Sequence, residues 1–208
     1  METPFGPNKV HHLIYHVVRS LDREFGAIEL MKIIFLIDVT YWRLFGKTIV
    51  GVQYIRHRKG PWAPDISEAA KDMYDHELNH RFCLSRGSSQ FLKKACSLGA
   101  RPRFEPELLP EEAEVTRQTL GVIGHLSPRE LESLAYDTEP MRAIVDKEIR
   151  FGRVLRGTPL DLDLIERDTF MLRWLKNREA TKDTPPDEEY ERWKQKERRE
   201  LEELLAQA

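Results

Sequence analysis

The sequence has 208 residues, of which 40% are hydrophobic and 33% are charged, and its formal net charge is −2. A chain of this length can enclose one hydrophobic core, and its balanced charge argues against a domain that binds nucleic acid through overall positive charge. No apolar stretch approaches the roughly 18 residues of a membrane span, and the start METPFGPNKV lacks the apolar region of a secretion signal.

The first part of the chain predicts two helices with apolar faces. Asn8 is a suitable N-cap, and apolar residues recur at helical spacing up to Leu21, so a first helix is expected before Gly26. A second helix is expected over about 28–45, with Gly46 as its stop. Its apolar residues extend beyond one stripe, which predicts a central helix that is covered on several sides.

A small hairpin is expected directly after the second helix. β-rich runs at 48–50 and 52–56 flank Gly51, which is suited to a tight turn. Asp38 is an acid on the otherwise apolar second helix, so it either faces solvent or accepts N–H bonds from the hairpin. The second arrangement is favoured, because a buried acid needs partners.

Further turns and helices are expected in the rest of the chain. Gly60-Pro61 predicts a turn into a third helix that starts after Asp65 and runs to about residue 79. A strand at 81–85 is expected to pair with 102–104, while 91–95 is either a helical turn or a loop. The remaining expected elements are helices from Pro110, after the capping box at Ser127, over 138–149 and over 162–176, then a linker at 177–186 and a charged helix at 187–207.

The order of certain residues in this pattern is more specific than the pattern itself. The order is an apolar segment at 32–38 that ends in Asp38, then Gly46, then 49–56 in the form I-x-G-x-x-Y-x-R, then Gly60-Pro61. This order resembles the SocA-like Panacea domain, the antitoxin module of many bacterial toxin–antitoxin pairs. Residues 127–136, followed by Glu139-Pro140-Met141, resemble a second stretch of that family, in which Trp often stands in place of Met141.

The pattern and the resemblance together predict an α+β fold, mainly α-helical, with a small antiparallel β-sheet inserted after the second helix. They predict a Panacea-like antitoxin domain over 1–156 and a helical extension over 157–180. A linker and a charged C-terminal helix are expected over 181–208.

The resemblance implies an antitoxin, bacterial or encoded by a prophage, that binds and neutralises a cognate protein toxin. It also leaves open a proteolytic adaptor that passes the toxin to a ClpXP-type protease. Such a protein is not an enzyme and needs no cofactor, and neither a membrane nor nucleic acid is an expected partner. A cytoplasmic location is expected, because the two cysteines, Cys83 and Cys96, suit a reducing compartment. Homo-oligomer formation stays open.

Four residues are candidates for contact with a partner. Tyr54, Arg56 and Trp62 are of the types that dominate binding hot spots. The alternatives are that Trp62 covers the core and that the basic run 56–59 is only a polar hairpin end. Trp193 is a candidate in the charged tail, because an isolated helix of that kind needs a surface to pack against.

A zinc metallopeptidase is the alternative function. The segment His76-Glu77-Leu78-Asn79-His80 matches H-E-x-x-H, in which both histidines bind zinc from one helical face and Glu77 activates a water. The opposing interpretation is that His76 and His80 end a helix, where the dipole favours imidazolium. His12 and His16 are also four residues apart, and both are expected to face solvent. The candidates for a third zinc ligand are Glu105, Glu107, Glu111, Glu112 and His125.

Overall fold

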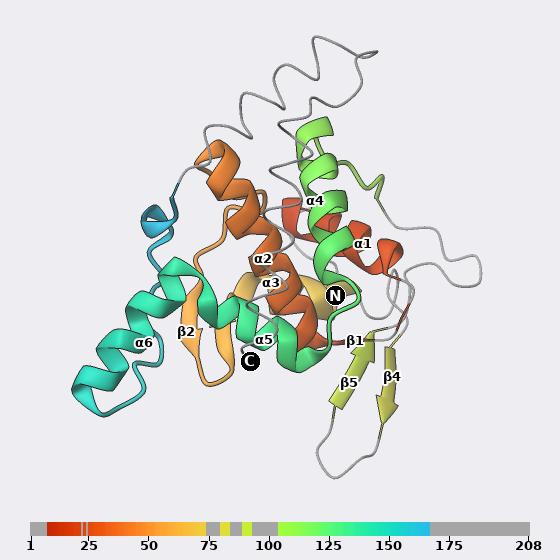
Figure 1. Ribbon diagram of the computed structural model, residues 1–208. Helices are drawn as coiled ribbons and strands as arrows, with labels where there is room; N and C mark the ends of the chain where they lie inside the picture. Colours follow the sequence, from red (N-terminus) through yellow and green to blue (C-terminus); the bar gives the residue numbers. More distant parts are fainter. Residues whose placement is uncertain are drawn as a thin grey trace. The chain divides into compact units, whose positions relative to one another are not determined.

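The computed structural model describes residues 8–21, 23, 25–73, 80–83, 89–92 and 104–166, and only the backbone at 80–83 and 89–92 (Figure 1). The chain divides into two compact units, Met1–Arg167 and Asp168–Ala208, and all described residues belong to the first. The fold of that unit is α+β and mainly α-helical, as predicted. No helix among its described residues is both long and apolar enough to cross a membrane.

The first two helices form where the sequence predicts them. Helix α1 (Lys9–Ser20) begins after Asn8, whose side-chain oxygen accepts hydrogen bonds from the N–H groups of Val10 and His11. Helix α2 (Ala27–Phe45) ends at Gly46, which adopts the left-handed conformation with φ of 68°. Such a C-terminal glycine satisfies a free carbonyl without steric cost, so both helix ends follow from local signals.

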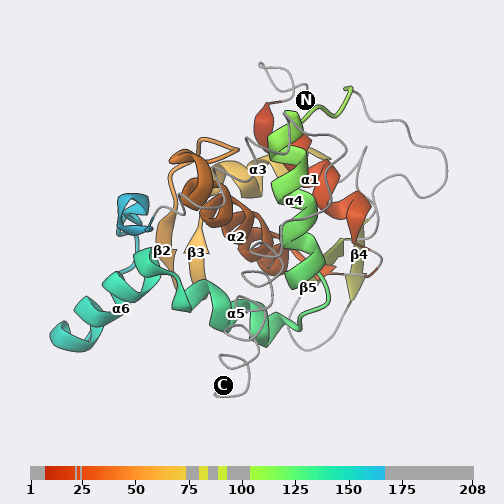
Figure 2. The ribbon, with the colours of Figure 1, turned by 45° about the horizontal axis from the view of Figure 1, so that its top comes forward.

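Helix α2 is the central element, as its apolar sequence predicts. It contacts α1, α3 (Pro64–Met73), α4 (Pro110–Ile123) and α5 (Pro128–Asp137), which surround it in Figure 2. Three of its charged residues, Glu29, Lys32 and Asp38, are buried, and each is paired or hydrogen-bonded, since a buried charge without partners would be very unfavourable. One is Lys32, whose Nζ lies 2.6 Å from a carboxylate oxygen of Glu132 in α5.

The antiparallel hairpin lies after α2, but not at the expected residues. Strand β2 (Ile55–His57) pairs with β3 (Gly60–Trp62), so the chain reverses at Arg58 and not at Gly51. The expected strand at 48–50 is wrong, because the Ile49 N–H donates to Asp38 Oδ1 at 2.8 Å. That run is therefore held against α2 and forms bends.

A second sheet contains three antiparallel strands in the order β1, β5, β4. These are β1 (Phe25–Gly26), β5 (Ser89–Leu92) and β4 (His80–Cys83). The expected strand near 81–85 pairs with β5 through its described residues 81–83, and Phe91 and Leu92 lie in β5 and not in the helical turn or loop expected at 91–95. Of the expected partner strand, residues 102 and 103 lie outside the described residues, and Phe104 is not in a strand. Phe104 instead packs on the rings of α1, with its centroid 5.0 Å from that of His12.

The remaining helices start at the predicted caps. Pro110 is the first residue of α4, and Ser127 caps α5 by accepting from the Glu130 N–H. Helix α6 (Glu139–Phe151) follows, then a 3-10 turn, η1 (Leu162–Leu164), that ends at Ile165. The expected helix over 162–176 is thus only a single turn as far as residue 166. The rest of that helix, residues 74–79 of the third helix, and the predicted linker and tail lie outside the described residues.

Candidate functional site

The tip of the hairpin presents positive charge to solvent. His57, Arg58 and Lys59 are exposed, and neither Arg58 nor Lys59 forms an ion pair with any residue that the structure describes. Because the whole chain carries a formal charge of −2, this basic turn is a local feature and not a reflection of the composition. Such a turn attracts an acidic group on another molecule.

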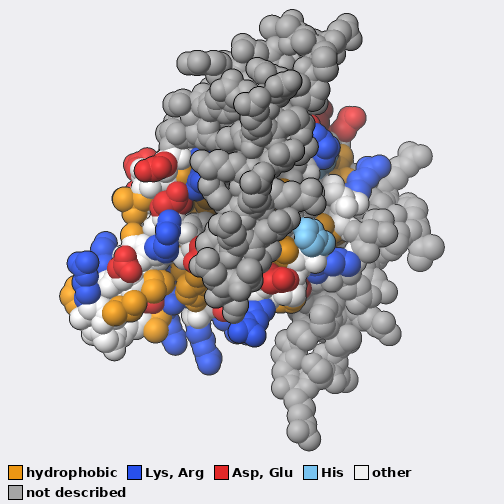
Figure 3. Space-filling model, in the orientation of Figure 1, with side chains coloured by type: hydrophobic (Ala, Val, Ile, Leu, Met, Phe, Trp, Pro, Cys, Tyr) orange, Lys and Arg blue, Asp and Glu red, His pale blue; other side chains and the backbone are white. Residues whose placement is uncertain are grey.

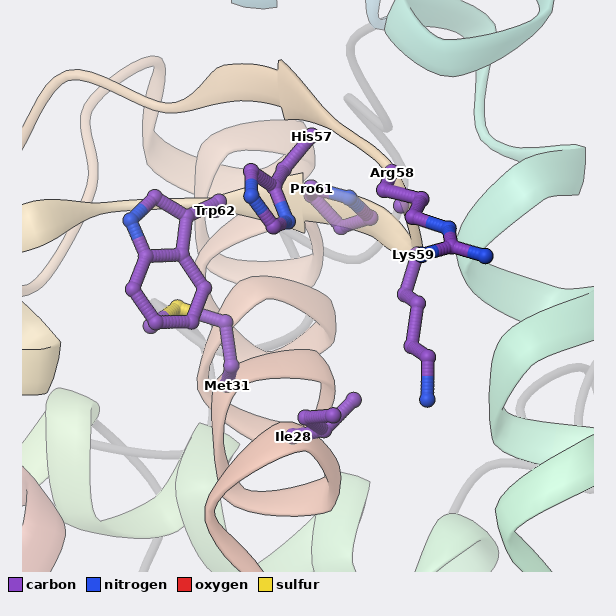
Figure 4. Close-up of a pocket in the computed structure, with 8 residues that line it drawn as sticks. Ile28, Met31, His57, Arg58, Lys59, Pro61 and Trp62 are labelled. Carbon is purple, nitrogen blue, oxygen red and sulfur yellow. The ribbon is translucent and has the colours of Figure 1, made fainter. Parts of the chain in front are cut away.

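An apolar pocket lies beside this turn, between the hairpin and the start of α2 (Figure 4). In Figure 4, Trp62 and His57 lie side by side on neighbouring strands while Ile28 and Met31 project from α2. The rings of His57 and Trp62 are 5.3 Å apart at an angle of 35°. Among the described residues, no carboxylate lines the pocket; those that line it are Ile28, Met31, His57, Arg58, Lys59, Gly60, Pro61 and Trp62. We name this set the hairpin pocket.

The volume of the hairpin pocket indicates what it can hold. It measures about 180 Å³, whereas pockets for small molecules and cofactors usually occupy about 300–1,000 Å³. Ile28 is 43% exposed and Trp62 is half-buried, so the apolar walls remain open to solvent. A pocket of this size and polarity suits one or two apolar side chains of another polypeptide.

The base of the hairpin is fixed by a buried arginine. Arg56 is 5% exposed, and its guanidinium donates to both carboxylate oxygens of Glu148 in α6, at 2.9 and 3.0 Å. It also donates to the Tyr136 hydroxyl at 2.9 Å and to the backbone carbonyl of His57. Burial alone raises the pKa of Glu148, but the hydrogen bonds from Arg56 and from the Leu155 N–H outweigh it and lower that pKa overall. The pair is therefore charged and ties the hairpin to α6, while the hydrogen bond to Tyr136 ties it to α5.

The segment leading into the hairpin is fixed by a second buried group, Asp38. Its Oδ2 accepts a hydrogen bond of 2.7 Å from the Tyr54 hydroxyl, while Oδ1 accepts from Ile49. This contact agrees with the favoured interpretation of Asp38 as an acceptor for backbone N–H groups. Burial raises the pKa of Asp38 to about 7, against the lowering effect of its hydrogen bonds.

The outer edge of β2 is also paired. The Arg56 N–H donates to the Thr158 carbonyl at 2.7 Å, and the Leu160 N–H donates to the Tyr54 carbonyl at 2.8 Å. Ile55 and Pro159 form an isolated antiparallel bridge. Since both edges of β2 are occupied, the hairpin is held as a rigid support for its exposed turn.

Three of the four residues predicted to contact a partner lie among the described residues, and they differ in exposure. Tyr54 is 0% exposed and Arg56 is 5% exposed, so neither side chain offers surface to another molecule in this structure. We therefore interpret Tyr54 and Arg56 as residues that support the hairpin, and not as residues whose side chains contact the partner. Trp62 is half-buried and lines the hairpin pocket, so it combines the two alternatives considered for it. Trp193 lies outside the described residues.

The backbone at His80 does not have the helical conformation that the zinc-binding alternative requires. His80 is the first residue of strand β4 and pairs with Leu92, whereas the motif needs both histidines on one helical turn. His76 and Glu77 lie outside the described residues. In the part of the chain that the structure describes, no three His, Cys, Asp or Glu side chains gather closely enough to hold a metal ion.

The expectation that His12 and His16 face solvent is wrong. Both are partly covered, and Nδ1 of His12 accepts a hydrogen bond of 2.8 Å from the Glu107 N–H. Burial lowers the pKa of His16, although a backbone hydrogen bond with Pro106 raises it. The segment before α4 therefore covers this face of α1, which the periodicity of α1 alone does not indicate.

Sequence reasoning missed most of the contacts that build this site. Glu148 and Tyr136 hold Arg56 across separations of 92 and 80 residues, and no local pattern signals such a pair. Ile28 and Met31 form the α2 side of the hairpin pocket. The one available signal for them was the excess of apolar residues beyond a single stripe of the second helix.

A family model covers the region that contains this site. Residues 30–140, more than half of the chain, match the model described as antitoxin SocA-like, Panacea domain. The match includes α2 from Leu30 onward, the hairpin and α5, and it ends at the start of α6. No curated protein and no solved structure matches the chain.

Proposed function

This chain belongs to the SocA-like Panacea antitoxin family, and from that premise we propose that it neutralises a cognate toxin by binding it directly through the hairpin pocket. The observation that carries the proposal is the family match over residues 30–140, which includes most of the residues that line the pocket. The protein acts by binding another polypeptide and not by catalysis. The toxin places an apolar side chain between Trp62 and α2.

The construction of the hairpin supports this proposal. An element that is already rigid loses little conformational entropy when a partner binds, so more of the contact energy appears as affinity. The Arg56–Glu148 pair and the Tyr54–Asp38 hydrogen bond supply that rigidity below the pocket. A half-buried Trp next to exposed cations is also the type of residue that dominates binding hot spots.

Co-expression with the product of the neighbouring gene tests the proposal. We expect the wild-type chain to rescue growth from a toxic neighbour and to be recovered in a complex with it. Trp62→Ala should weaken that complex by at least about 30-fold, the effect of losing a hot-spot residue. Trp42→Ala is the matched control, because Trp42 is also half-buried but lies near the other end of α2, away from the pocket.

The same assay separates direct neutralisation from delivery to a protease. Direct neutralisation predicts rescue that persists in a host without ClpXP and a toxin level that does not fall when the antitoxin is present. Rescue that requires the protease would instead favour the adaptor mode. Binding of the neighbour by Trp62→Ala as tight as that of wild type would exclude the hairpin pocket as the contact surface.

A further inference from the structure

The end of α6 exposes apolar side chains to an unusual degree. Ile149 is 73% exposed, Phe151 is 66% exposed, and Val154, just beyond the helix, is 50% exposed. They lie within six consecutive residues, and in Figures 1 and 2 this end of α6 points away from α1 to α4. Single exposed apolar residues are common on protein surfaces, but a cluster usually marks a contact site.

Positive charge surrounds these apolar side chains. Lys147, Arg150 and Arg153 are exposed, and none of them forms an ion pair with a residue that the structure describes. Of the two acids in this stretch, Glu148 is neutralised by Arg56 and Asp146 is exposed, so the three cations still leave a net positive charge. Figure 3 shows blue Lys and Arg side chains next to orange hydrophobic ones over α6. We name Ile149, Phe151 and Val154, together with these three cations, the α6 tip.

The composition of the α6 tip favours a protein over other anionic partners. A nucleic-acid backbone would pair with the cations, but it would leave the three apolar side chains in water. A membrane-surface helix buries an apolar face along its length. In α6, Met141 and Ile144 are buried in this unit, and the exposed large apolar side chains are confined to the last turn. A polypeptide that carries both acidic and apolar side chains satisfies both features of the tip.

We propose that the α6 tip is a second contact surface for the captured partner and that it binds an acidic, amphipathic helical segment of that protein. This inference rests on the proposed function, since the occupant is a part of the same toxin. The Arg56–Glu148 pair links the tip to the base of the hairpin, so the two surfaces are held by one ion pair. Only the start of α6 lies within the residues that match the family, so the tip lies outside the matched region.

A synthetic probe tests the tip without knowledge of the toxin. The probe is a labelled amphipathic helical peptide with Leu on one face and Glu on the other, and a peptide with Lys in place of Glu is its control. The wild-type chain should bind the Leu–Glu peptide and not the Leu–Lys peptide, and binding should weaken as salt is raised, since salt screens exposed charges. Fluorescence anisotropy measures both affinities.

Two double variants locate the binding. Ile149→Ser with Phe151→Ser, and separately Arg150→Glu with Arg153→Glu, should each weaken binding of the Leu–Glu peptide by about tenfold or more. Lys71→Glu with Arg129→Glu makes the same change in net charge at exposed positions of α3 and α5 and should leave the affinity unchanged. All these residues are exposed, so thermal unfolding should confirm that each variant remains folded.

Several outcomes would overturn the inference. Unchanged binding of the Leu–Glu peptide by both tip variants would do so, as would tip-dependent binding of duplex DNA or phosphatidylserine vesicles that exceeds binding of the peptide. A wild-type dimer that the tip variants dissociate would mean that a second copy covers this surface. A toxin complex that is weakened by Trp62→Ala but not by either tip variant would show that the tip is not a contact surface, while the proposed function would stand. If no toxin complex forms while the peptide still binds, the proposed function fails and the chemistry of the tip stands.

Discussion

At the scale of single residues, Asp38 shows how one acid can be both unfavourable to bury and structurally required. Its carboxyl is 0% exposed and accepts hydrogen bonds from Tyr54 and Ile49, which lie 16 and 11 residues further along the chain. These bonds fix the path of the chain between α2 and the hairpin. Burial nevertheless raises the pKa of the carboxyl from 3.8 to about 7, so the folded state binds a proton more tightly than the unfolded state.

This difference predicts a stability that depends on pH. Below pH 4 the carboxyl is protonated in both states, and above pH 7 it is ionised in both. Between these values the folded protein keeps a proton that the unfolded chain has lost, so the free energy of unfolding falls as the pH rises. The fall attributable to Asp38 is on the order of 4 kcal/mol, because each unit of pKa difference corresponds to about 1.4 kcal/mol. Urea unfolding at several pH values measures it.

Asp38→Asn is the control for this prediction. Asparagine has nearly the same shape but does not titrate, so the variant's stability is offset from wild type and lacks the contribution of Asp38 to the pH dependence. The difference in unfolding free energy between the two proteins should therefore change between pH 4 and pH 7 and stay constant above it. A difference that is the same at all pH values would show that the carboxyl of Asp38 has the same pKa in the folded and unfolded states.

At the scale of elements, the Arg56–Glu148 pair decides whether the hairpin and α6 stay together. Both side chains are largely buried, at 5% and 11% exposed, so removing one leaves the other as an uncompensated buried charge. Arg56→Met should lower the free energy of unfolding by about 3–5 kcal/mol, as is typical when one partner of a buried pair is lost. Urea denaturation measures the change.

The double variant Arg56→Met with Glu148→Met separates loss of the pair from loss of packing. Because it leaves no buried charge, it should be clearly more stable than Arg56→Met alone, and a double-mutant cycle gives the coupling. Hydrogen exchange should become faster at both β2 and α6 in the single variant. Faster exchange at only one of these elements would mean that the pair does not join them.

Elements whose ends are set by nearby residues could be predicted from the sequence, whereas elements placed by distant contacts could not. The starts of α1, α4 and α5 were predictable from local signals. The side chains of Asn8 and Ser127 accept hydrogen bonds from N–H groups within three residues, and Pro110 has no N–H group that needs a partner at the start of α4. The hairpin was displaced by several residues, because Ile49 has high strand propensity but its N–H binds Asp38. A tertiary hydrogen bond thus overrode local preference, which is the common failure of propensity-based reasoning.

The candidate site was less predictable than the fold for the same reason. Trp62 and the basic turn were visible in the sequence as an aromatic residue next to a run of cations. Their setting was not visible, because the pocket forms only when β3 packs on the start of α2, and Glu148 reaches Arg56 across 92 residues. The exposure of Phe151 also depends on where α6 leaves the core, which periodicity does not encode.

At the scale of the whole described unit, α2 contacts most of the other elements. It contacts α1, α3, α4, α5 and β3, and its buried residues occupy all sides of the helix. Elements that share one central helix should lose their structure together, because none of them can keep its packing after α2 is lost. The hairpin pocket then exists only while the complete core is folded.

Truncation of one side chain at the centre of this unit tests that dependence. Phe35 is 0% exposed, and its ring packs edge-on against Tyr54 with centroids 5.0 Å apart. Phe35→Ala should lower the free energy of unfolding by about 3–5 kcal/mol, a large part of the roughly 5–15 kcal/mol that stabilises a typical domain. Hydrogen exchange should show the same loss of protection in α1 and α4 as in α2.

Val122→Ala, at a site that is 44% exposed on α4, should change the stability by less than about 0.5 kcal/mol. Protection lost only in α2 and the hairpin would mean that the unit opens in parts, and the pocket would then be able to open without unfolding of the core.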